Sequence, residues 1–354
     1  SSARYAAQAN KYVYYNNMRD RATYDEESDG PEDPFKGNDE IPKLPDGILD
    51  DTFVVPCNNP NDVSCKLRDT CGQAPLNPLS KPPAKLANQR IIHGENQTLG
   101  EWPSYVRIRI IKRSGRSNYT EECGGALISD RHIVTASQCI WNWDEADNQY
   151  YPVLDPTNIM VAFKQHDLDE DFVKVAAKAN WYCGSPMYTP VPLVYPKFAY
   201  HDWATLELAE PLKRFNEHIQ PACLPFESID TTSADAQCYM VGSGAHRQDH
   251  IDLTKVDLPT VVQKLRVRVL PCGSAVLMGE LMQCYVSPNN RQAGACIFDR
   301  GDPIYCLDKK KRWTLVGVNS NAHACGEGFG PIDRLGISTN IRQHLEAMKK
   351  FCHI

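Results

Sequence analysis

Fourteen cysteines constrain this 354-residue chain more than any other sequence feature. They are spread along the chain, and only Cys57/Cys65 and Cys65/Cys71 come even loosely near the short spacings typical of zinc ligands. An even number of dispersed cysteines indicates a disulfide framework, which persists in oxidising compartments. We therefore expect a secreted, extracellular protein that is cross-linked by disulfides and has no metal site and no cofactor.

Several classes of function are disfavoured by composition. No run approaches the roughly 18 apolar residues that a membrane-spanning helix needs. A net charge of −6 argues against binding to nucleic acid. Two Asn-x-Thr sequons, at Asn96 and Asn118, are predicted glycosylation sites of a secreted glycoprotein. The expected partners are therefore proteins.

The charge is concentrated at one end of the chain. Residues 1–56 hold 12 acidic and 6 basic side chains, whereas residues 57–354 hold 32 of each. The first segment is punctuated by Pro and Gly and is poor in large aliphatic residues, so we expect an extended, non-globular tail that binds through its aromatic and acidic side chains. Residues 57–90, with three cysteines and many prolines, are predicted to be a propeptide-like linker.

From residue 91 the sequence pattern changes to short runs in which apolar and polar residues alternate with the periodicity of a strand, and turn residues separate the runs. They are SYVRIRII, GGALIS, HIVTA, NIMVAF, VVQKLRVRVL and RWTLVGV. One helical pattern, IRQHLEAMKKF, lies near the end of the chain. These runs predict an all-β domain over 91–354 that is built as a barrel and ends in a C-terminal helix.

A series of motifs in this region resembles the trypsin-like (chymotrypsin-fold) serine protease family. They are RIIHG (90–94), CGGALISDRHIVTASQC (123–139), HDWATLEL (201–208), IQPACLP (219–225), CYMVGSG (238–244), CIFDRGDPIYC (296–306), LVGVNS (315–320) and LGISTNI (335–341). They follow the family order. The resemblance implies two packed antiparallel β-barrels with an active site in the cleft between them.

The same resemblance shows which catalytic groups are replaced. The family histidine stands in TAAHC, and here TASQC places Gln138 at that position. The family serine stands in GDSGGP, and here FDRGDP places Arg300 there, so that only Asp202 of the triad is kept. An amide cannot act as a base, and a guanidinium does not attack carbonyls. Losing such a Ser or His removes a factor of roughly 10⁶ in turnover, so we expect a pseudoprotease, not an enzyme.

Other positions of the family site have also changed. Phe298 stands where the oxyanion hole normally has glycine, and Gly294 stands at the floor of the specificity pocket. The substrate-pairing strand reads Ser320-Asn321-Ala322 where the family prefers Ser-Trp-Gly. Rewired catalysis is the opposing hypothesis and makes the chain an atypical peptidase. Its candidate groups are a base among His132, His201 and His323 and a nucleophile at Ser137 or Ser320.

The scaffold chemistry implied by the resemblance is intact. The implied disulfides are Cys123–Cys139, Cys238–Cys306, Cys272–Cys284, Cys296–Cys325 and, between linker and domain, Cys71–Cys223. The remaining four cysteines allow three pairings, of which we favour Cys57–Cys65 with Cys183–Cys352.

Part of the family's activation logic is also present. Cleavage between Arg90 and Ile91 would free an α-amino group to pair with Asp299; inheritance of Asp299 from an ancestor, with Arg90 never cut, explains the same residues. Two further segments suggest metals but are better interpreted as exposed loops: the acidic run 165–171, and His246 with His250.

Binding is the function that remains if catalysis is lost. The resemblance implies a non-catalytic serine protease homologue that acts as a cofactor, scaffold or decoy in an extracellular proteolytic or innate-immunity cascade. The alternative is a structural or carrier subunit of a large extracellular assembly.

Overall fold

A computed structural model describes the greater part of the domain. The described residues are 63–76, 94–114, 117–144, 149–152, 155–163, 176–185, 189–190, 199–244, 247–248, 256–257, 260–272, 280–288, 293–295, 299–321, 336–352 and 354. The tail 1–56 lies outside these residues, so its predicted role is not tested. Within them, no helix has the length and the run of apolar side chains needed to cross a membrane.

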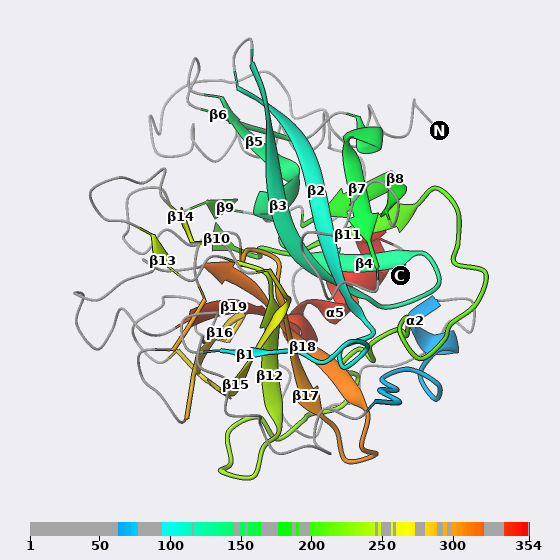
Figure 1. Cartoon of the computed structure of the whole chain (residues 1–354), viewed down its shortest axis with the longest axis vertical. Helices are drawn as coiled ribbons and strands as arrows, with labels where there is room; N and C mark the ends of the chain where they lie inside the picture. The colour runs from blue at the N-terminus through cyan, green and yellow to red at the C-terminus, as the bar shows by residue number, and fades with distance from the viewer. Residues whose placement is uncertain are drawn as a thin grey trace, which may run out of the picture.

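Six strands form a closed antiparallel barrel in the order β11-β4-β3-β2-β7-β8. Their bounds are β2 Tyr105–Ser114, β3 Ser117–Leu127, β4 His132–Thr135, β7 Ile159–Ala162, β8 Ala176–Gly184 and β11 Ala204–Leu208. This barrel occupies the upper half of the molecule in Figure 1.

Seven strands form the second sheet, in the order β1-β15-β12-β17-β18-β19-β16. Their bounds are β1 Glu95–Asn96, β12 Cys238–Gly242, β15 Gln263–Leu270, β16 Met282–Val286, β17 Pro303–Leu307, β18 Trp313–Asn321 and β19 Gly336–Asn340. Because β16 also pairs with β15, the sheet curls back on itself below the first barrel (Figure 1). The predicted chymotrypsin-like class, two antiparallel barrels and a C-terminal helix, is confirmed.

Short elements decorate the two barrels. They are α2 Val63–Lys66, α3 Ser137–Ile140, η1 Pro156–Asn158 and the paired strands β5 Trp141–Asp144 with β6 Gln149–Pro152, β9 Thr189–Pro190 with β10 Ala199–Tyr200, and β13 Arg247–Gln248 with β14 Val256–Asp257. Helix α3 carries Gln138 and therefore matters for the site.

Alternation of side chains decides which face of each strand enters the core. Strand β15 is buried at every second residue, as expected when one face packs inward and the other meets solvent. Strand β4 is buried throughout; it is part of the barrel wall and is paired on both sides, with β3 and with β11. In β2 the inward face carries Val106, Ile108 and Ile110, and the same face then continues to Lys112.

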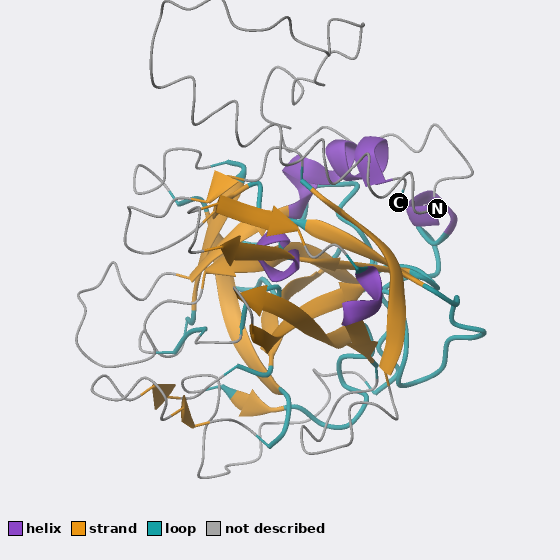
Figure 2. Cartoon of the chain, turned by 90° about the horizontal axis from the view of Figure 1, so that it is seen from above, coloured by secondary structure: helices purple, strands orange, loops and turns teal. Residues whose placement is uncertain are grey.

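The C-terminal helix α5, Ile341–Cys352, links the two barrels. It follows β19 directly, and its last residue, Cys352, forms a disulfide with Cys183 of β8. Leu345 and Met348 on its buried face have no solvent exposure. Figure 2 shows this helix running along the outside of the strands.

Five disulfides join described residues. They are Cys71–Cys223, Cys123–Cys139, Cys183–Cys352, Cys238–Cys306 and Cys272–Cys284. Each is a pairing named from the sequence. Cys65 is also disulfide-bonded, whereas its expected partner Cys57 and the pair Cys296/Cys325 lie outside the described residues.

The linker segment 63–76 is docked on the domain by more than its disulfide. Gly72 adopts a φ of 71°, and its N–H donates to the Pro221 carbonyl at 2.7 Å. A Cβ at Gly72 would lie 2.7 Å from the Trp313 carbonyl oxygen, so this close approach needs glycine. Arg68 adds an ion pair to Glu227 at 3.0 Å.

Candidate functional site

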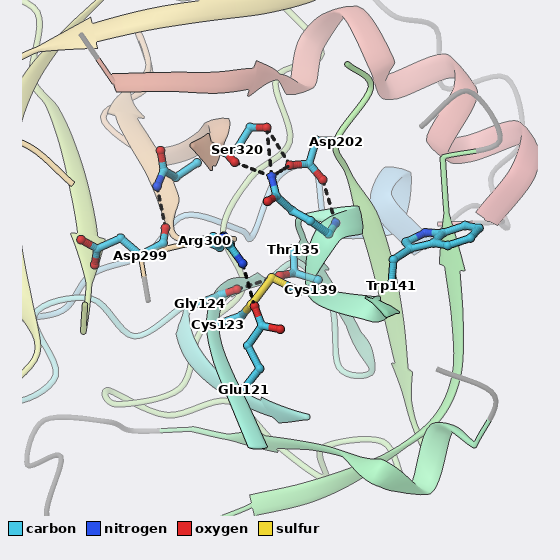
Figure 3. The surroundings of a disulfide bond; sticks show 12 residues. Glu121, Cys123, Gly124, Thr135, Cys139, Trp141, Asp202, Asp299, Arg300 and Ser320 are labelled. Carbon is cyan, nitrogen blue, oxygen red and sulfur yellow. Dashed lines mark hydrogen bonds and ion pairs between the residues drawn. A yellow bond between two sulfur atoms is a disulfide. The ribbon is translucent and has the colours of Figure 1, made fainter. Parts of the chain in front are cut away.

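Gln138 and Asp202 are joined by hydrogen bonds, and Figure 3 shows the Asp202 carboxyl beside Ser320. Gln138 lies in the single turn of α3, and its backbone N–H donates to Asp202 Oδ1 at 2.9 Å. Its side-chain Nε2 donates to Asp202 Oδ2 and to the Ser320 carbonyl. The amide thus bridges Asp202 to strand β18.

Asp202 is fully buried and is held from several sides. The Ser320 hydroxyl donates to its Oδ2 at 2.6 Å, and the Thr339 hydroxyl donates to its backbone carbonyl at 2.8 Å. Burial raises the pKa of the Asp202 carboxyl to about 6, although the hydrogen bonds from Gln138 and Ser320 oppose the rise. The group therefore keeps the position of an orienting carboxylate, but the group that it orients is an amide.

Arg300 lies at the surface and forms an ion pair. Its Nη1 is 3.1 Å from Glu121 Oε1 on β3, and its backbone carbonyl accepts from Gly124 N–H at 2.9 Å. Figure 3 shows the guanidinium directed toward Glu121, beside the Cys123–Cys139 disulfide. The Arg300 side chain is 49% exposed, so it presents a permanent positive charge to solvent.

Lys112 contacts the same glutamate, Glu121, from the buried side. It is buried, forms a second ion pair with Glu121, and donates to the backbone carbonyls of Gln138 at 3.0 Å and Trp141 at 2.8 Å. Burial lowers the pKa of the Lys112 ammonium, and Glu121 opposes that shift. All three ammonium hydrogens thus have acceptors. The ion pairs Arg300–Glu121 and Glu121–Lys112, with the hydrogen bond from Lys112 to the Gln138 carbonyl, connect Arg300 to Gln138.

Two residues close to Arg300 in the sequence, Asp299 and Asp302, carry buried carboxyl groups. Asp299 Oδ1 accepts from Gly244 N–H at 2.7 Å, and both Asp299 and Asp302 have no solvent exposure. The Asp302 carboxyl fits against Gly242, where a Cβ would lie 1.8 Å from Asp302 Oδ2. Burial raises the pKa of Asp302 well above its ordinary value, and the Asp299 carboxyl beside it adds to the rise.

The candidate groups for rewired catalysis are engaged elsewhere. The Ser137 hydroxyl donates to the Trp203 carbonyl at 2.6 Å and the Ser320 hydroxyl to Asp202, and a hydroxyl has one hydrogen to donate. His132 Nδ1 lies 2.9 Å from Ser129 Oγ. His201 adopts a φ of 53° and directs Nδ1 to His344 Nε2 at 3.0 Å. His323 lies outside the described residues.

The remaining predicted positions divide between described and undescribed residues. Gly294 is half-buried, and a Cβ there would meet no atom within 4 Å. Asn321 ends β18 and pairs with Ile337. Asn96 and Asn118 are exposed. Outside the described residues lie Arg90, Ile91, Phe298, Ala322, the acidic run 165–171, and His246 with His250.

Three residues of the site escaped the sequence analysis: Lys112, Glu121 and Asp302. Strand alternation could have indicated Lys112, because it shares the inward face of β2 with Ile110. Glu121 likewise stands two residues before Cys123 on one face of β3. Asp302 had the clearest signal, since it replaces a glycine of the GDSGGP motif and is followed by a strand.

Comparisons with known proteins agree with this geometry. The family model described as Trypsin matches residues 91–342. Testisin of Homo sapiens is 28% identical over 286 residues, covering 77% of this chain and 82% of testisin. Phenoloxidase-activating factor 3 of Holotrichia diomphalia is 26% identical over 281 residues, covering 74% of this chain and 72% of the factor.

A third relative is much longer than this chain. Ovochymase of Halocynthia roretzi is 24% identical over 273 residues, which are 73% of this chain but 15% of that protein. Since the family model spans most of the chain and the two barrels are those of its fold, the chain belongs to the trypsin family of serine proteases and their homologues.

Proposed function

We propose that this chain is a secreted, non-catalytic member of the trypsin family that acts by binding proteins. The observation that carries the proposal is the hydrogen-bonded unit of Gln138, Asp202 and Ser320. Gln138 stands at the position of the base and uses its amide to join Asp202 to β18. A primary amide cannot accept a proton from a nucleophile near neutral pH.

The nucleophile position supports the same conclusion. Arg300 is held in an ion pair with Glu121 and carries no nucleophilic atom at any accessible pH. Restoring catalysis would therefore require a base, a nucleophile and the removal of a cation from the place where the substrate carbonyl would lie. The contacts of Lys112 with Glu121 and Gln138 make the replaced site a stable structural unit.

The biological role follows from what a cross-linked, inactive protease fold can still do. We place the chain as a cofactor, scaffold or decoy in an extracellular proteolytic cascade, including innate-immunity cascades. The similarity to a protein named phenoloxidase-activating factor 3 supports a cascade setting, and the five disulfides support an oxidising compartment. The sequons at Asn96 and Asn118 are exposed, as glycan acceptors must be.

Cleavage after Arg90 is part of this proposal. The freed Ile91 α-amino group would pair with buried Asp299, while Cys71–Cys223 would keep the N-terminal segment attached. Trypsin-treated protein should then migrate as one band without reductant and as two bands with it. Two species on the non-reducing gel would contradict the attachment.

The activity test uses the full chain before and after limited trypsin treatment, with the added trypsin removed by inhibitor resin. A fluorophosphonate probe and a broad peptide library should give no labelling and no cleavage above the background of the buffer. Labelling that maps to this chain would overturn the proposal and favour an atypical peptidase. Native-fluid purification adds a second readout, since a fixed-stoichiometry complex would favour a structural or carrier subunit.

A matched variant checks the reasoning. The double substitution Gln138→His with Arg300→Ser should restore little activity, because Gly294 and Asn321 also differ from the family pattern. An active trypsin in the same assay serves as the positive control. Turnover of the double variant near that of trypsin would mean that only two side chains had been lost.

A further inference from the structure

Within the part of the chain that the structure describes, the Arg300 guanidinium contacts one carboxylate, that of Glu121, and uses Nη1 for it. The Nε–Nη2 edge can bind a second carboxylate through two parallel hydrogen bonds. Among the described residues, no other side chain is hydrogen-bonded to that guanidinium. We propose that Arg300 is a receptor for one carboxylate of a partner protein.

The ion pair of Arg300 reduces the side-chain conformational entropy that is lost when a carboxylate binds. Glu121 is 14% exposed and is itself held by Lys112, which is 3% exposed and bonded to two backbone carbonyls. A free arginine must lose its rotamer freedom when it binds, whereas this one is already restrained by its ion pair with Glu121. Preorganisation of this kind is what distinguishes a binding residue from a surface arginine.

The burial of each charged side chain determines which charge a binding partner meets first. The Lys112 ammonium and the carboxyl groups described above around Arg300, those of Glu121, Asp202, Asp299 and Asp302, are buried or nearly so, whereas Arg300 is 49% exposed. A partner approaching the cleft therefore meets a cation first, and the charge that complements it is an anion.

A polyanion such as a sulfated polysaccharide fits less well than a single carboxylate. Such ligands need several adjacent bases, and residues 57–354 are neutral overall. Among the described side chains of the Arg300–Glu121 network, the other base is Lys112, whose three hydrogens are already used. The geometry therefore favours one acidic residue, or one chain terminus, of a protein segment.

Tyr119 supplies an apolar wall beside the cation. It stands on the same face of β3 as Glu121, directly opposite Lys112, and is 42% exposed. Asn118 has the opposite orientation in the strand, so a glycan there would leave the Tyr119 face open. Exposed Tyr and Arg side chains are the types that carry most binding energy at protein interfaces.

This inference rests on the proposed non-catalytic function, since an enzyme would need the same surface for its substrate. The test is selection of a random dodecapeptide phage library on the full glycosylated chain. Peptides enriched on the unaltered chain should carry Asp or Glu at one fixed position. The Arg300→Ser variant should bind them about 10- to 100-fold more weakly, as expected for the loss of a charge-assisted pair.

Three further variants make the outcome specific. Arg300→Lys keeps the charge without the fork and should retain part of the affinity, and Arg300→Glu should select basic peptides instead. Tyr119→Ala should weaken binding about threefold or more without changing the acidic preference. Arg131→Ser is the matched control, because Arg131 is 39% exposed and also pairs with a carboxylate, that of Glu207 at 3.5 Å; it should bind the peptides unchanged.

Synthetic copies of the enriched peptides, as free acids and as amides, separate an acidic side chain from a chain terminus as the source of the carboxylate. Circular dichroism of each variant confirms folding. Selection without acidic preference, equal binding by Arg300→Ser, or tighter Arg300-dependent binding of heparin would overturn the proposal. Fluorophosphonate labelling is read separately: labelling with the acidic preference intact refutes the proposed function but not the receptor.

Discussion

Asp202 and Asp302 are both fully buried carboxyl groups, yet their surroundings differ. Asp202 accepts hydrogen bonds from the Gln138 backbone, the Gln138 amide and the Ser320 hydroxyl. No hydrogen bond of ordinary geometry reaches either carboxyl oxygen of Asp302 from the described residues; the Asp299 carboxyl and the Ser243 N–H are polar groups beside it. The first carboxyl is integrated into the fold, and the second is accommodated by glycine backbones.

The difference shows which substitutions the fold has compensated. At Asp202 the Gln138 backbone N–H and side-chain amide supply two of the donors. At Asp302 a charge entered a motif position usually held by glycine, and the space comes from Gly124 and Gly242. Substitutions that remove or retain each titrating group can therefore test whether partnered and unpartnered carboxyls differ in their cost to stability.

The largest effect is expected at Asp302. Its folded pKa is raised, so folding favours the protonated form, and stability is lost as pH rises above the ordinary value of 3.8. The isosteric Asp302→Asn variant does not titrate, and its advantage over the unaltered chain should grow by up to about 1.4 kcal/mol per pH unit. Urea unfolding at pH 5 and pH 8 measures this, with exposed Asp235→Asn as the control. Parallel stabilities at both pH values would contradict it.

His344 should give an effect of opposite sign. Its Nδ1 donates to the Asn340 carbonyl at 2.8 Å and its Nε2 faces His201, while burial lowers its pKa from 6.5 to about 4. Stability that is present above pH 6.5 is then lost as pH falls toward 4, by roughly 3 kcal/mol. His344→Gln should flatten this acid-side loss in urea unfolding at pH 4.5 and 7. An unchanged acid slope would show that His344 does not control it.

Asp202 should contribute a slightly smaller total change in stability with pH, over a limited pH range. Its pKa of about 6 means that stability falls as pH rises from 3.8 to 6 and is constant above, with a total near 3 kcal/mol. Asp202→Asn should remove this slope and also lose a hydrogen bond, because in either orientation its NH2 group faces a Gln138 donor, the backbone N–H or the side-chain Nε2. In the Asp302→Asn variant, in which the Asp302 titration is absent, the Asp202 slope should end in a plateau above pH 6.5, whereas in the unaltered chain the slope from Asp302 continues.

Arg300 should matter least for stability. Its ion pair with Glu121 is exposed on one side, and such pairs contribute about 0–1 kcal/mol. Thermal melting of Arg300→Ser should therefore stay within a few degrees of the unaltered chain. A large loss would mean that Arg300 holds the fold together, and weaker peptide binding by this variant could then not be attributed to the receptor.

The sequence predicts the frame better than the site. Local alternation and motif order are sufficient for the strands and for the two barrels, because burial of one strand face is a short-range pattern. Arg300, Gln138 and Asp202 were found through motif positions. The pairing of Glu121 with Lys112 and Arg300 was not, since it depends on β2, β3 and the loop before β17 meeting in space, 179 residues apart for Glu121 and Arg300.

Helix α5 is anchored at both of its ends. Its first residue continues directly from β19, and its last is bonded through Cys352 to Cys183 in the other barrel. Helix termini ordinarily fray, so their amides exchange with solvent far faster than those of the core. Here neither end can open locally without displacing a strand. Amide hydrogens of Leu345 and Met348 should consequently exchange only through unfolding of both barrels together, which makes this helix a reporter of whole-domain cooperativity.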